Sequence, residues 1–289
     1  MKIMVTGAGG FVGSRLAAYY GKKYDVWGVT HKDLDLTNEA AVFKTVENYH
    51  PDVLIHCAAI SDVAECSKKP ELSHAVNVLG MEYLAKACGK TGTKLVMCSS
   101  DQVYFRKRGE QESLDAYLEP HWEDCIETPE PLYGKQKLQG EELCLKYQPE
   151  SVVLRLSWMY DNLTEEELAK GRRSLAMMLR EMLDKKQSRK FSDTDHRGAT
   201  DVNLVVKNME AAWKLAGGIY NYGSSNDADM YETVRRVMAS FGQEALVEKA
   251  TGGNVRNLMM STDKLAQHGI FFPDTAAGLE AFLRKGDAL

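Results

Sequence analysis

Two residues whose chemistry depends on each other, Tyr133 and Lys137, stand four positions apart in the sequence. Residues four apart share one face of a helix, and the apolar spacing predicts a helix over 133–147. A phenol with a pKa of ~10 is a poor acid–base catalyst at neutral pH. An ammonium ~4 Å away, at an effective dielectric of ~20, would stabilise the phenolate by about 4 kcal/mol and lower its pKa by about three at most. The spacing therefore predicts that Tyr133 exchanges a proton near neutral pH, where general acid–base catalysis is most effective.

A pair of serines follows a predicted strand where it can serve the same reaction. The apolar run 95–98 predicts the strand, and Ser99 and Ser100 come directly after it. At the carboxyl edge of a parallel sheet such hydroxyls face the ligand crevice. Ser100 is therefore predicted to donate a hydrogen bond to a substrate carbonyl oxygen that Tyr133 protonates. Without Tyr133 and Lys137, serines that merely cap a strand end would be the preferred interpretation.

A glycine cluster lies between the first predicted strand, 3–5, and an amphipathic helix marked by Phe11, Leu16 and Tyr19. Gly7, Gly10 and Gly13 allow a tight turn, a close approach of the backbone to a pyrophosphate, and packing of helix on strand. The N–H groups of the helix start, at Phe11 and Val12, would face that anion. A glycine cluster alone is weak evidence, but this strand–turn–helix context predicts a dinucleotide site.

The end of the second predicted strand, 26–29, bears on which dinucleotide binds. An acid there would hold the 2′-hydroxyl of NAD, and a cation would favour the 2′-phosphate of NADP. The strand is followed by His31 and Lys32, whereas Asp33 and Asp35 lie about twenty residues past Gly13. The cations favour NADP(H), and the spacing of the acids keeps NAD(H) open.

The elements that position these groups alternate along the first half of the chain. Apolar runs predict strands at 3–5, 26–29, 53–56, 95–98 and 152–156. A helix between Thr37, as its N-cap, and Pro51 precedes helices at 71–90 and 133–147. This alternation predicts an α/β fold, a doubly wound parallel (Rossmann) sheet with a smaller interleaved C-terminal substrate lobe.

The second half is less regular. A basic stretch at 172–190 is expected to be helical, a short strand is expected at 217–222, and helices at 230–241 and 275–285. We expect a dinucleotide-binding domain over 1–158, to which 200–225 returns, and a substrate lobe made of 159–199 and 226–289.

The composition excludes several classes of protein. The 289 residues are 44% hydrophobic and 27% charged, which is typical of a globular chain. A net charge of -5 gives no general attraction to nucleic acid or membrane surfaces. The six cysteines show no metal-binding spacing and fit buried positions in a reducing cytoplasm, and His56 is expected to be a packed core residue rather than a metal ligand. We expect a cytoplasmic protein with no metal and a small-molecule partner, and leave a homodimer open.

Taken together, these motifs resemble the extended short-chain dehydrogenase/reductases, and within them the dTDP-4-dehydrorhamnose reductase family, over nearly the whole chain. The resemblance rests on segments 6–13, 33–37, 57–61, 75–80, 154–160 and 195–200, and on Ser100, Tyr133 and Lys137 as a catalytic triad. It implies hydride transfer from a nicotinamide to C4 of a nucleotide-linked 4-keto sugar, with Lys137 also holding the nicotinamide ribose. It further implies cofactor contacts by Asp35, Leu36, Ala58, Ala59 and Ser99, and substrate contacts by Ser61, Gln102 and Trp158.

Some features depart from the family pattern or are open to two interpretations. The segment between Tyr104 and Pro131 is longer and more charged than usual, and Ala64 and Ala199 replace common family residues, so the sugar stays open. Arginines 172, 173 and 180 would either clamp a diphosphate or form a solvated helix face.

Two other functions fit the same scaffold. One is a nucleotide-sugar epimerase or dehydratase, which would not consume reduced cofactor stoichiometrically. The other is a non-catalytic cofactor-binding subunit, like the regulatory subunit of methionine adenosyltransferase. Fold alone does not separate these functions.

Overall fold

A computed structural model describes residues 1–125 and 128–286. Two compact units divide the chain. The first is made of Met1–Val103, Glu127–Leu156 and Val206–Tyr220, and the second of Tyr104–Ile126, Ser157–Val205 and Asn221–Leu289. Segment 104–126 therefore belongs to the second unit, whereas the sequence assigned it to the first domain. The last three positions of the predicted lobe 226–289 lie outside the described residues.

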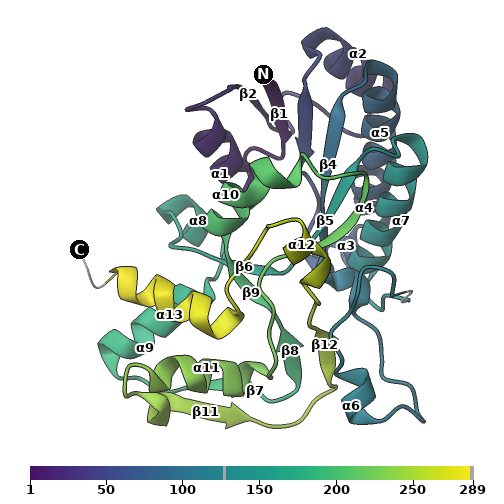
Figure 1. Ribbon diagram of the computed structural model, residues 1–289. Helices are drawn as coiled ribbons and strands as arrows, with labels where there is room; N and C mark the ends of the chain where they lie inside the picture. Colours follow the sequence, from purple (N-terminus) through teal and green to yellow (C-terminus); the bar gives the residue numbers. More distant parts are fainter. Residues whose placement is uncertain (126–127, 287–289) are drawn as a thin grey trace. The chain divides into compact units, whose positions relative to one another are not determined.

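The first unit is built on a sheet of six strands in the order β10-β5-β4-β3-β1-β2 (Figure 1). Its strands are β1 (Lys2–Thr6), β2 (Asp25–Val29), β3 (Val53–His56), β4 (Lys94–Ser100), β5 (Val152–Leu156) and β10 (Gly218–Tyr222). The pairs β1–β2, β1–β3, β3–β4 and β4–β5 are all parallel. The Rossmann-like α/β fold expected from the sequence is confirmed.

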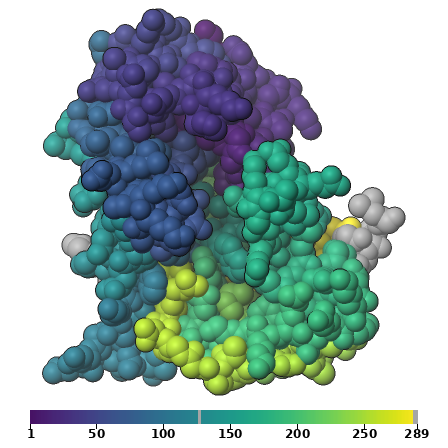
Figure 2. All heavy atoms as spheres, turned by 180° about the vertical axis from the view of Figure 1, so that it is seen from behind, coloured from purple at the N-terminus to yellow at the C-terminus, as the bar shows by residue number. Residues whose placement is uncertain are grey.

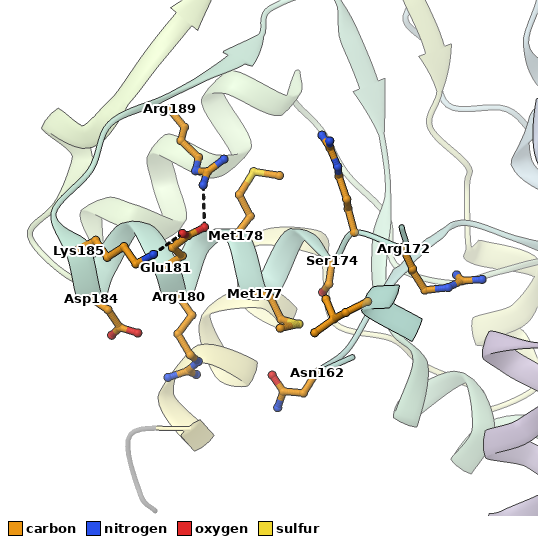
Figure 3. A pocket seen from close by; sticks show the side chains of 12 residues that line it. Asn162, Arg172, Ser174, Met177, Met178, Arg180, Glu181, Asp184, Lys185 and Arg189 are labelled. Atoms are coloured by element: carbon orange, nitrogen blue, oxygen red, sulfur yellow. Dashed lines mark hydrogen bonds and ion pairs between the residues drawn. The ribbon is translucent and has the colours of Figure 1, made fainter. Parts of the chain in front are cut away.

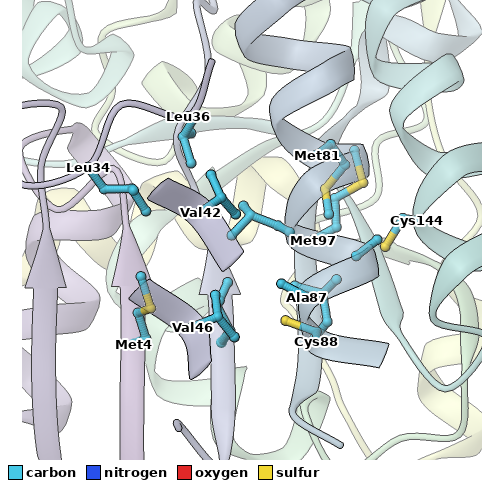
Figure 4. Close-up of a cluster of buried hydrophobic side chains, with 14 of the residues drawn as sticks. Met4, Leu34, Leu36, Val42, Val46, Met81, Ala87, Cys88, Met97 and Cys144 are labelled. Atoms are coloured by element: carbon cyan, nitrogen blue, oxygen red, sulfur yellow. The ribbon is translucent and has the colours of Figure 1, made fainter. Parts of the chain in front are cut away.

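Helices cover both faces of this sheet. One face is covered by α2 (Glu39–Tyr49), α5 (Gly80–Thr91) and α7 (Leu132–Tyr147). Figure 4 shows the apolar cluster beneath them, to which the buried side chains of Met4, Val42, Met81 and Met97 belong. On the other face, α1 (Phe11–Tyr20) meets residues 206–212, where Tyr20 Oη donates to Val206 O at 2.8 Å.

The remaining helices of the first unit are short. They are α3 (Val63–Lys68), α4 (Pro70–His74), the π-helical turn η1 (Ala75–Leu79) and the 3₁₀ turn η2 (Asp101–Tyr104), while α10 (Val202–Ala212) runs from the second unit into the first. Because α4, η1 and α5 follow without a break, they correspond to the single helix predicted at 71–90.

The second unit contains three two-stranded sheets and several helices. Its strands are β6 (Trp158–Tyr160), β7 (Arg189–Ser192), β8 (Asp195–Arg197), β9 (Ala199–Asp201), β11 (Val247–Ala250) and β12 (Arg256–Leu258). Its helices are α6 (Leu114–Tyr117), α8 (Glu165–Ala169), α9 (Leu175–Lys185), α11 (Met230–Ala239), η3 (Glu244–Leu246), α12 (Asp263–Gln267) and α13 (Thr275–Gly286).

Pairing in the second unit joins segments far apart in the sequence. β7 pairs with β11, β8 with β12 and β6 with β9, all in parallel. Figure 2 shows the result at the surface, where green atoms from the middle of the chain lie beside yellow-green atoms from nearer its end. An apolar cluster from α9, α11 and α13 fills the interior, with Leu179, Val234 and Leu279 fully buried.

Three local predictions are corrected. Asn38 rather than Thr37 caps α2, because its side chain accepts from Ala41 N while the Thr37 hydroxyl donates to Asp35. Tyr20 rather than Tyr19 is buried on α1. The basic stretch 172–190 is helical only over Leu175–Lys185, and its last residues enter β7.

Candidate functional site

The carboxyl ends of β1 and β3 are adjacent at the point where the strand order reverses. β2 pairs with β1 on one side, and β3 pairs with β1 on the other. In open parallel sheets such a reversal forms the crevice in which ligands bind. The first residues beyond these strands are Gly7 and Cys57. The glycine-rich turn therefore lies where the fold itself predicts a ligand.

The glycine turn is compact because backbone contacts backbone. Gly7 has a φ of +71°, and a Cβ there would lie 2.6 Å from Ala58 N. Gly10 N donates to Gly7 O at 2.8 Å, and a Cβ on Gly13 would overlap Gly7 O. Only glycine satisfies these contacts, so the turn keeps the low profile that a diphosphate needs.

The N-terminus of α1 completes this turn. In the described part of the chain, no side chain caps this helix at Gly10 and its first turn contains no acidic residue. Phe11 is buried and Val12 half-buried. Arg15 packs 4.1 Å from the Phe11 ring and donates to Phe11 O at 2.9 Å. A helix start with these features suits an anion, so the residues fit a dinucleotide diphosphate.

The segment after β2 carries exposed basic side chains and an aspartate whose carboxylate is hydrogen-bonded within its own turn. His31 and Lys32 are exposed. The carboxylate of Asp33 accepts from Thr30 N at 2.8 Å and from Thr30 Oγ1 at 2.7 Å, and these hydrogen bonds lower its pKa. Asp33 therefore stabilises its own turn, while the two basic side chains remain at the surface.

The next two predicted cofactor residues differ from each other in burial. Asp35 is exposed and accepts from Thr37 N and Thr37 Oγ1, which lowers its pKa. Leu36 is buried in the apolar cluster of the first unit, and its Cβ lies 3.0 Å from where a Cβ on Gly80 would be. Only the backbone of Leu36 is therefore placed to meet a ligand.

The segment after β3 is held by a residue absent from the predicted site. Ala58 and Ala59 are half-buried and Ser61 is exposed. Asn77 in the π-helical turn donates to Ile60 O at 3.0 Å and accepts from Ile60 N at 2.9 Å. An asparagine inside an otherwise apolar helical run was the available sequence signal for this anchoring role.

Ser100, Tyr133 and Lys137 come together at the carboxyl end of β4. The Ser100 hydroxyl donates to Asp101 Oδ1 at 3.1 Å and lies close enough to the Tyr133 phenol to affect its pKa. Lys137 Nζ lies 5.8 Å from the centroid of the Tyr133 ring and donates to Cys98 O at 2.9 Å. All three residues are in the first unit, at the same edge of the sheet as the glycine turn. The structure thus brings the predicted catalytic residues together, and their roles remain predictions.

The start of α7 lies directly on the strand end. A Cβ on Gly134 would overlap Gln102 O, so only glycine allows this approach. Gln102 is half-buried, and its N donates to Ser100 Oγ at 3.2 Å. Gly134 and Gln102 therefore fix the spacing between Ser100 and Tyr133.

The pKa of Tyr133 is shifted in the direction opposite to the prediction. Burial raises it well above its usual range, the Asp101 carboxylate raises it further, and the hydrogen bond with Ser100 opposes both. Burial also lowers the pKa of Lys137. The predicted lowering by Lys137 is wrong because desolvation of a phenolate outweighs a cation at this distance. Tyr133 is therefore protonated at neutral pH.

A buried polar network lies behind Lys137 and was not predicted. Ser99 Oγ donates to Glu141 Oε1 at 2.5 Å, and Arg155 binds the same carboxylate through Nε at 3.1 Å and Nη2 at 2.7 Å. Glu141 follows Lys137 by one helical turn. Ser99 was predicted to line the cofactor, but its hydroxyl belongs to this network.

Trp158 and the three arginines belong to the second unit. Trp158 is half-buried, and the Arg197 guanidinium lies 5.0 Å from its ring. Arg172, Arg173 and Arg180 line a cavity of about 610 Å³ beside α9, shown in Figure 3. The same figure shows Glu181 bound by Lys185 and Arg189, so the cavity wall carries both signs of charge.

Two further features are absent from the described residues, a metal-binding cluster and a membrane-spanning helix. Across 1–125 and 128–286, no three His, Cys, Asp or Glu side chains gather in a way that could bind a metal. In the same residues no helix has the length and hydrophobicity needed to span a membrane. His56 is fully buried at the end of β3 and hydrogen-bonds to Thr6 Oγ1 at 2.7 Å, which confirms it as a core residue.

Comparison with known proteins identifies the family of this chain and several relatives. Residues 1–260 match the family model described as the RmlD substrate binding domain. A dTDP-4-dehydrorhamnose reductase of Mycobacterium tuberculosis is 33% identical over 177 residues, which are 61% of this chain and 56% of that protein. Methionine adenosyltransferase 2 subunit beta of Xenopus laevis is 28% identical over 93% of this chain and 83% of its own length.

Solved structures support the fold. A dTDP-4-dehydrorhamnose reductase from Bacillus anthracis, crystallised in complex with NADP, superimposes with a TM-score of 0.80 at 21% identity, covering 98% of both chains.

Proposed function

Because the chain belongs to the RmlD substrate-binding-domain family, we propose that it is a reductase that uses NADPH to reduce the 4-keto group of a nucleotide-linked deoxysugar. The observation that carries this proposal is the convergence of Ser100, Tyr133 and Lys137 at the sheet edge that holds the glycine turn. The curated reductase and the NADP-bound reductase structure support the same activity.

The arrangement of these three side chains suits reduction. The nicotinamide supplies a hydride to the carbonyl carbon when it is bound. Ser100 orients the carbonyl oxygen by hydrogen bonding, and Tyr133 donates the proton that this oxygen needs as negative charge develops. The raised pKa of Tyr133 keeps that proton in place at neutral pH, so the phenol begins the reaction as an acid.

Lys137 has donors left for a second partner. An ammonium has three N–H groups, and among the described residues only Cys98 O accepts one of them. The remaining donors of this buried group can bind the hydroxyls of the cofactor's ribose, as the family resemblance implies. Lys137 then contributes to cofactor affinity as well as to the rate.

The surface near β2 supports NADPH over NADH. His31 and Lys32 are exposed beyond the strand, while the Asp33 carboxylate is engaged by Thr30. A 2′-phosphate would meet cations there, and a 2′-hydroxyl would not meet an available carboxylate from Asp33.

The relative that favours a different function is the methionine adenosyltransferase subunit, which matches more of this chain than the curated reductase does. A chain with that role would bind the cofactor without turning over a sugar. The decisive test incubates the purified protein with NADPH and a panel of nucleotide-linked 4-keto sugars and follows absorbance of the reduced cofactor.

The outcomes separate the candidate functions. Stoichiometric NADPH oxidation with formation of the 4-hydroxy sugar supports the reductase. Conversion of sugar without net oxidation would indicate an epimerase or dehydratase. Tight NADPH binding with no turnover on any ketone would indicate a binding subunit and contradict the proposal.

A further inference from the structure

Two thiols face each other at the carboxyl end of the central strands. Cys98 lies in β4, and Cys57 is the first residue beyond β3. The parallel register pairs His56 with Met97, so Cys57 and Cys98 occupy the next step of the same ladder. Their Sγ atoms are 3.4 Å apart, about 1.4 Å more than the ~2.0 Å of a covalent S–S bond. An approach of about 1.4 Å, shared between the two side chains and the strand ends that carry them, would join them.

The surroundings of this pair make one sulfur the better nucleophile. The two sulfurs share a hydrogen bond, and this bond, together with the Lys137 ammonium, lowers the pKa of Cys98. The same hydrogen bond and burial raise the pKa of Cys57. Because the thiolate is the reactive form, Cys98 is the attacking sulfur and Cys57 its proton-bearing partner.

The other cysteines provide a contrast. Burial raises the pKa of Cys88 and Cys144, which lie in the apolar cluster. Cys66 is buried, and its thiol bonds to Ile60 O at 3.1 Å. Only Cys57 and Cys125 are half-buried, and Cys125 is in the second unit. Within the described residues, the Cys57–Cys98 pair alone combines one half-buried member, a nearby cation and a second sulfur at 3.4 Å, while Cys98 itself is buried.

We propose that Cys57 and Cys98 form an oxidation site at which hydrogen peroxide produces a disulfide between β3 and β4. The Cys98 thiolate attacks one peroxide oxygen, the O–O bond breaks, and the departing hydroxide takes the proton of Cys57 to become water. The Cys57 thiolate then attacks the sulfenic sulfur of Cys98, the S–O bond breaks, and the second hydroxide takes the proton that Cys98 first released. Two thiols are oxidised, and one peroxide is reduced to two waters.

The new bond would disturb the cofactor site, a consequence that rests on the proposed function. The backbone of Cys57 and Ala58 lies against Gly7, where a Cβ would already be only 2.8 Å from the Cys57 carbonyl carbon. Cys98 O is the acceptor that holds Lys137. Drawing the two sulfurs together moves both contacts. Misplacement of the groups of a site by ~1 Å can reduce its performance by ~10²-fold. Oxidation therefore weakens NADPH binding reversibly.

The test uses the full chain, first reduced and then treated with hydrogen peroxide. Free thiols are alkylated, and the tryptic peptides 45–68 and 95–106 are sought as a cross-linked pair that loses two hydrogen atoms. Since Cys57 and Cys66 share peptide 45–68, fragmentation between them assigns the linkage. The Cys57→Ala and Cys98→Ala variants should form no such product, and the matched Cys125→Ala variant should form it like the parent chain.

NADPH affinity is measured on the same samples by fluorescence. We expect a loss of about tenfold or more on oxidation, recovery with dithiothreitol, and no loss in peroxide-treated Cys57→Ala relative to its own untreated sample. Absence of the 57–98 cross-link in the parent chain, which needs no variant to observe, would overturn the oxidation site. A cross-link with unchanged affinity would overturn its coupling to the cofactor. If reduced protein binds no NADPH, the proposed function fails while the cross-link result stands.

Discussion

Glu141 and Arg155 form an ion pair in which both side chains are almost completely buried, 1% and 3% exposed, with Nη2 2.7 Å from Oε2. Glu141 is on α7 and Arg155 on β5, so the pair ties the helix that carries Tyr133 and Lys137 to the sheet. Arg155 donates to both oxygens of the carboxylate through Nε and Nη2, and Ser99 Oγ donates to it as well.

Removal of one partner should therefore be costly. Glu141→Ala leaves the Arg155 guanidinium buried without its carboxylate, and we expect unfolding free energy to fall by about 3–5 kcal/mol in urea titrations. Glu166→Ala removes an exposed partner of Lys170 and is the matched control, with a much smaller loss expected because solvent screens that pair. Equal losses of unfolding free energy in the two variants would show that the buried ion pair stabilises the fold no more than the exposed one does.

Tyr133→Phe tests the proton donor. The variant keeps the ring and loses the hydroxyl beside Ser100, so turnover should fall by about 10²–10⁴-fold. NADPH affinity should change little, because Lys137 and the glycine turn are intact. Tyr147→Phe, at the far end of the same helix, is the control and should retain its rate. Full activity in Tyr133→Phe would remove the phenol from the mechanism.

Lys32→Ala tests the choice of dinucleotide. If the exposed ammonium meets the 2′-phosphate, NADPH affinity should fall about tenfold, whereas NADH affinity should not change. The measurement is fluorescence titration with both cofactors, and Lys44→Ala, an exposed lysine on α2, is the control. An equal effect on both cofactors would argue against phosphate recognition at this position.

His56 should make stability depend on pH. Burial lowers its pKa from an ordinary 6.5 to about 3, so the unfolded chain binds a proton that the folded chain does not. The stability due to neutral His56 is complete above pH 6.5 and is lost as the pH falls towards 3. When the pH falls from 6.5 to 5, the free energy of unfolding should fall by about 2 kcal/mol because of His56.

The comparison that isolates this effect is between variants. In urea titrations at both pH values, His56→Gln should lose less stability on acidification than the parent chain by about 2 kcal/mol. His74→Gln, an exposed histidine on α4, should keep the parent dependence. Identical dependence in all three proteins would contradict a role for His56.

Sequence patterns predicted the strands well where apolar runs are bounded on both sides. Val53–His56 and Val152–Leu156 begin and end at the predicted residues. Errors arose where neighbouring residues could serve equally, as at Tyr19 and Tyr20, which both follow Leu16 at helical spacing. Tyr20 points into the protein, where its hydroxyl donates a hydrogen bond to Val206 O, which is distant in sequence.

The candidate site was predictable where spacing along one element places the groups, as for Tyr133 and Lys137 on α7. It was not predictable where partners come from different elements. The contacts of Glu141 with Arg155, and of Cys57 with Cys98, exist only because strand register and helix packing bring those residues together. The direction of the Tyr133 pKa shift failed for the same reason, since burial is a tertiary property.

The contact of Gly134 with Gln102 separates two tasks in the chain. This contact keeps Ser100 and Tyr133 near each other. In the sequence 32 positions lie between them, and segment 104–126 belongs to the other unit. The contact itself involves no atom of segment 104–126. The spacing of Ser100 and Tyr133 is thus set by a backbone contact inside the first unit rather than by segment 104–126.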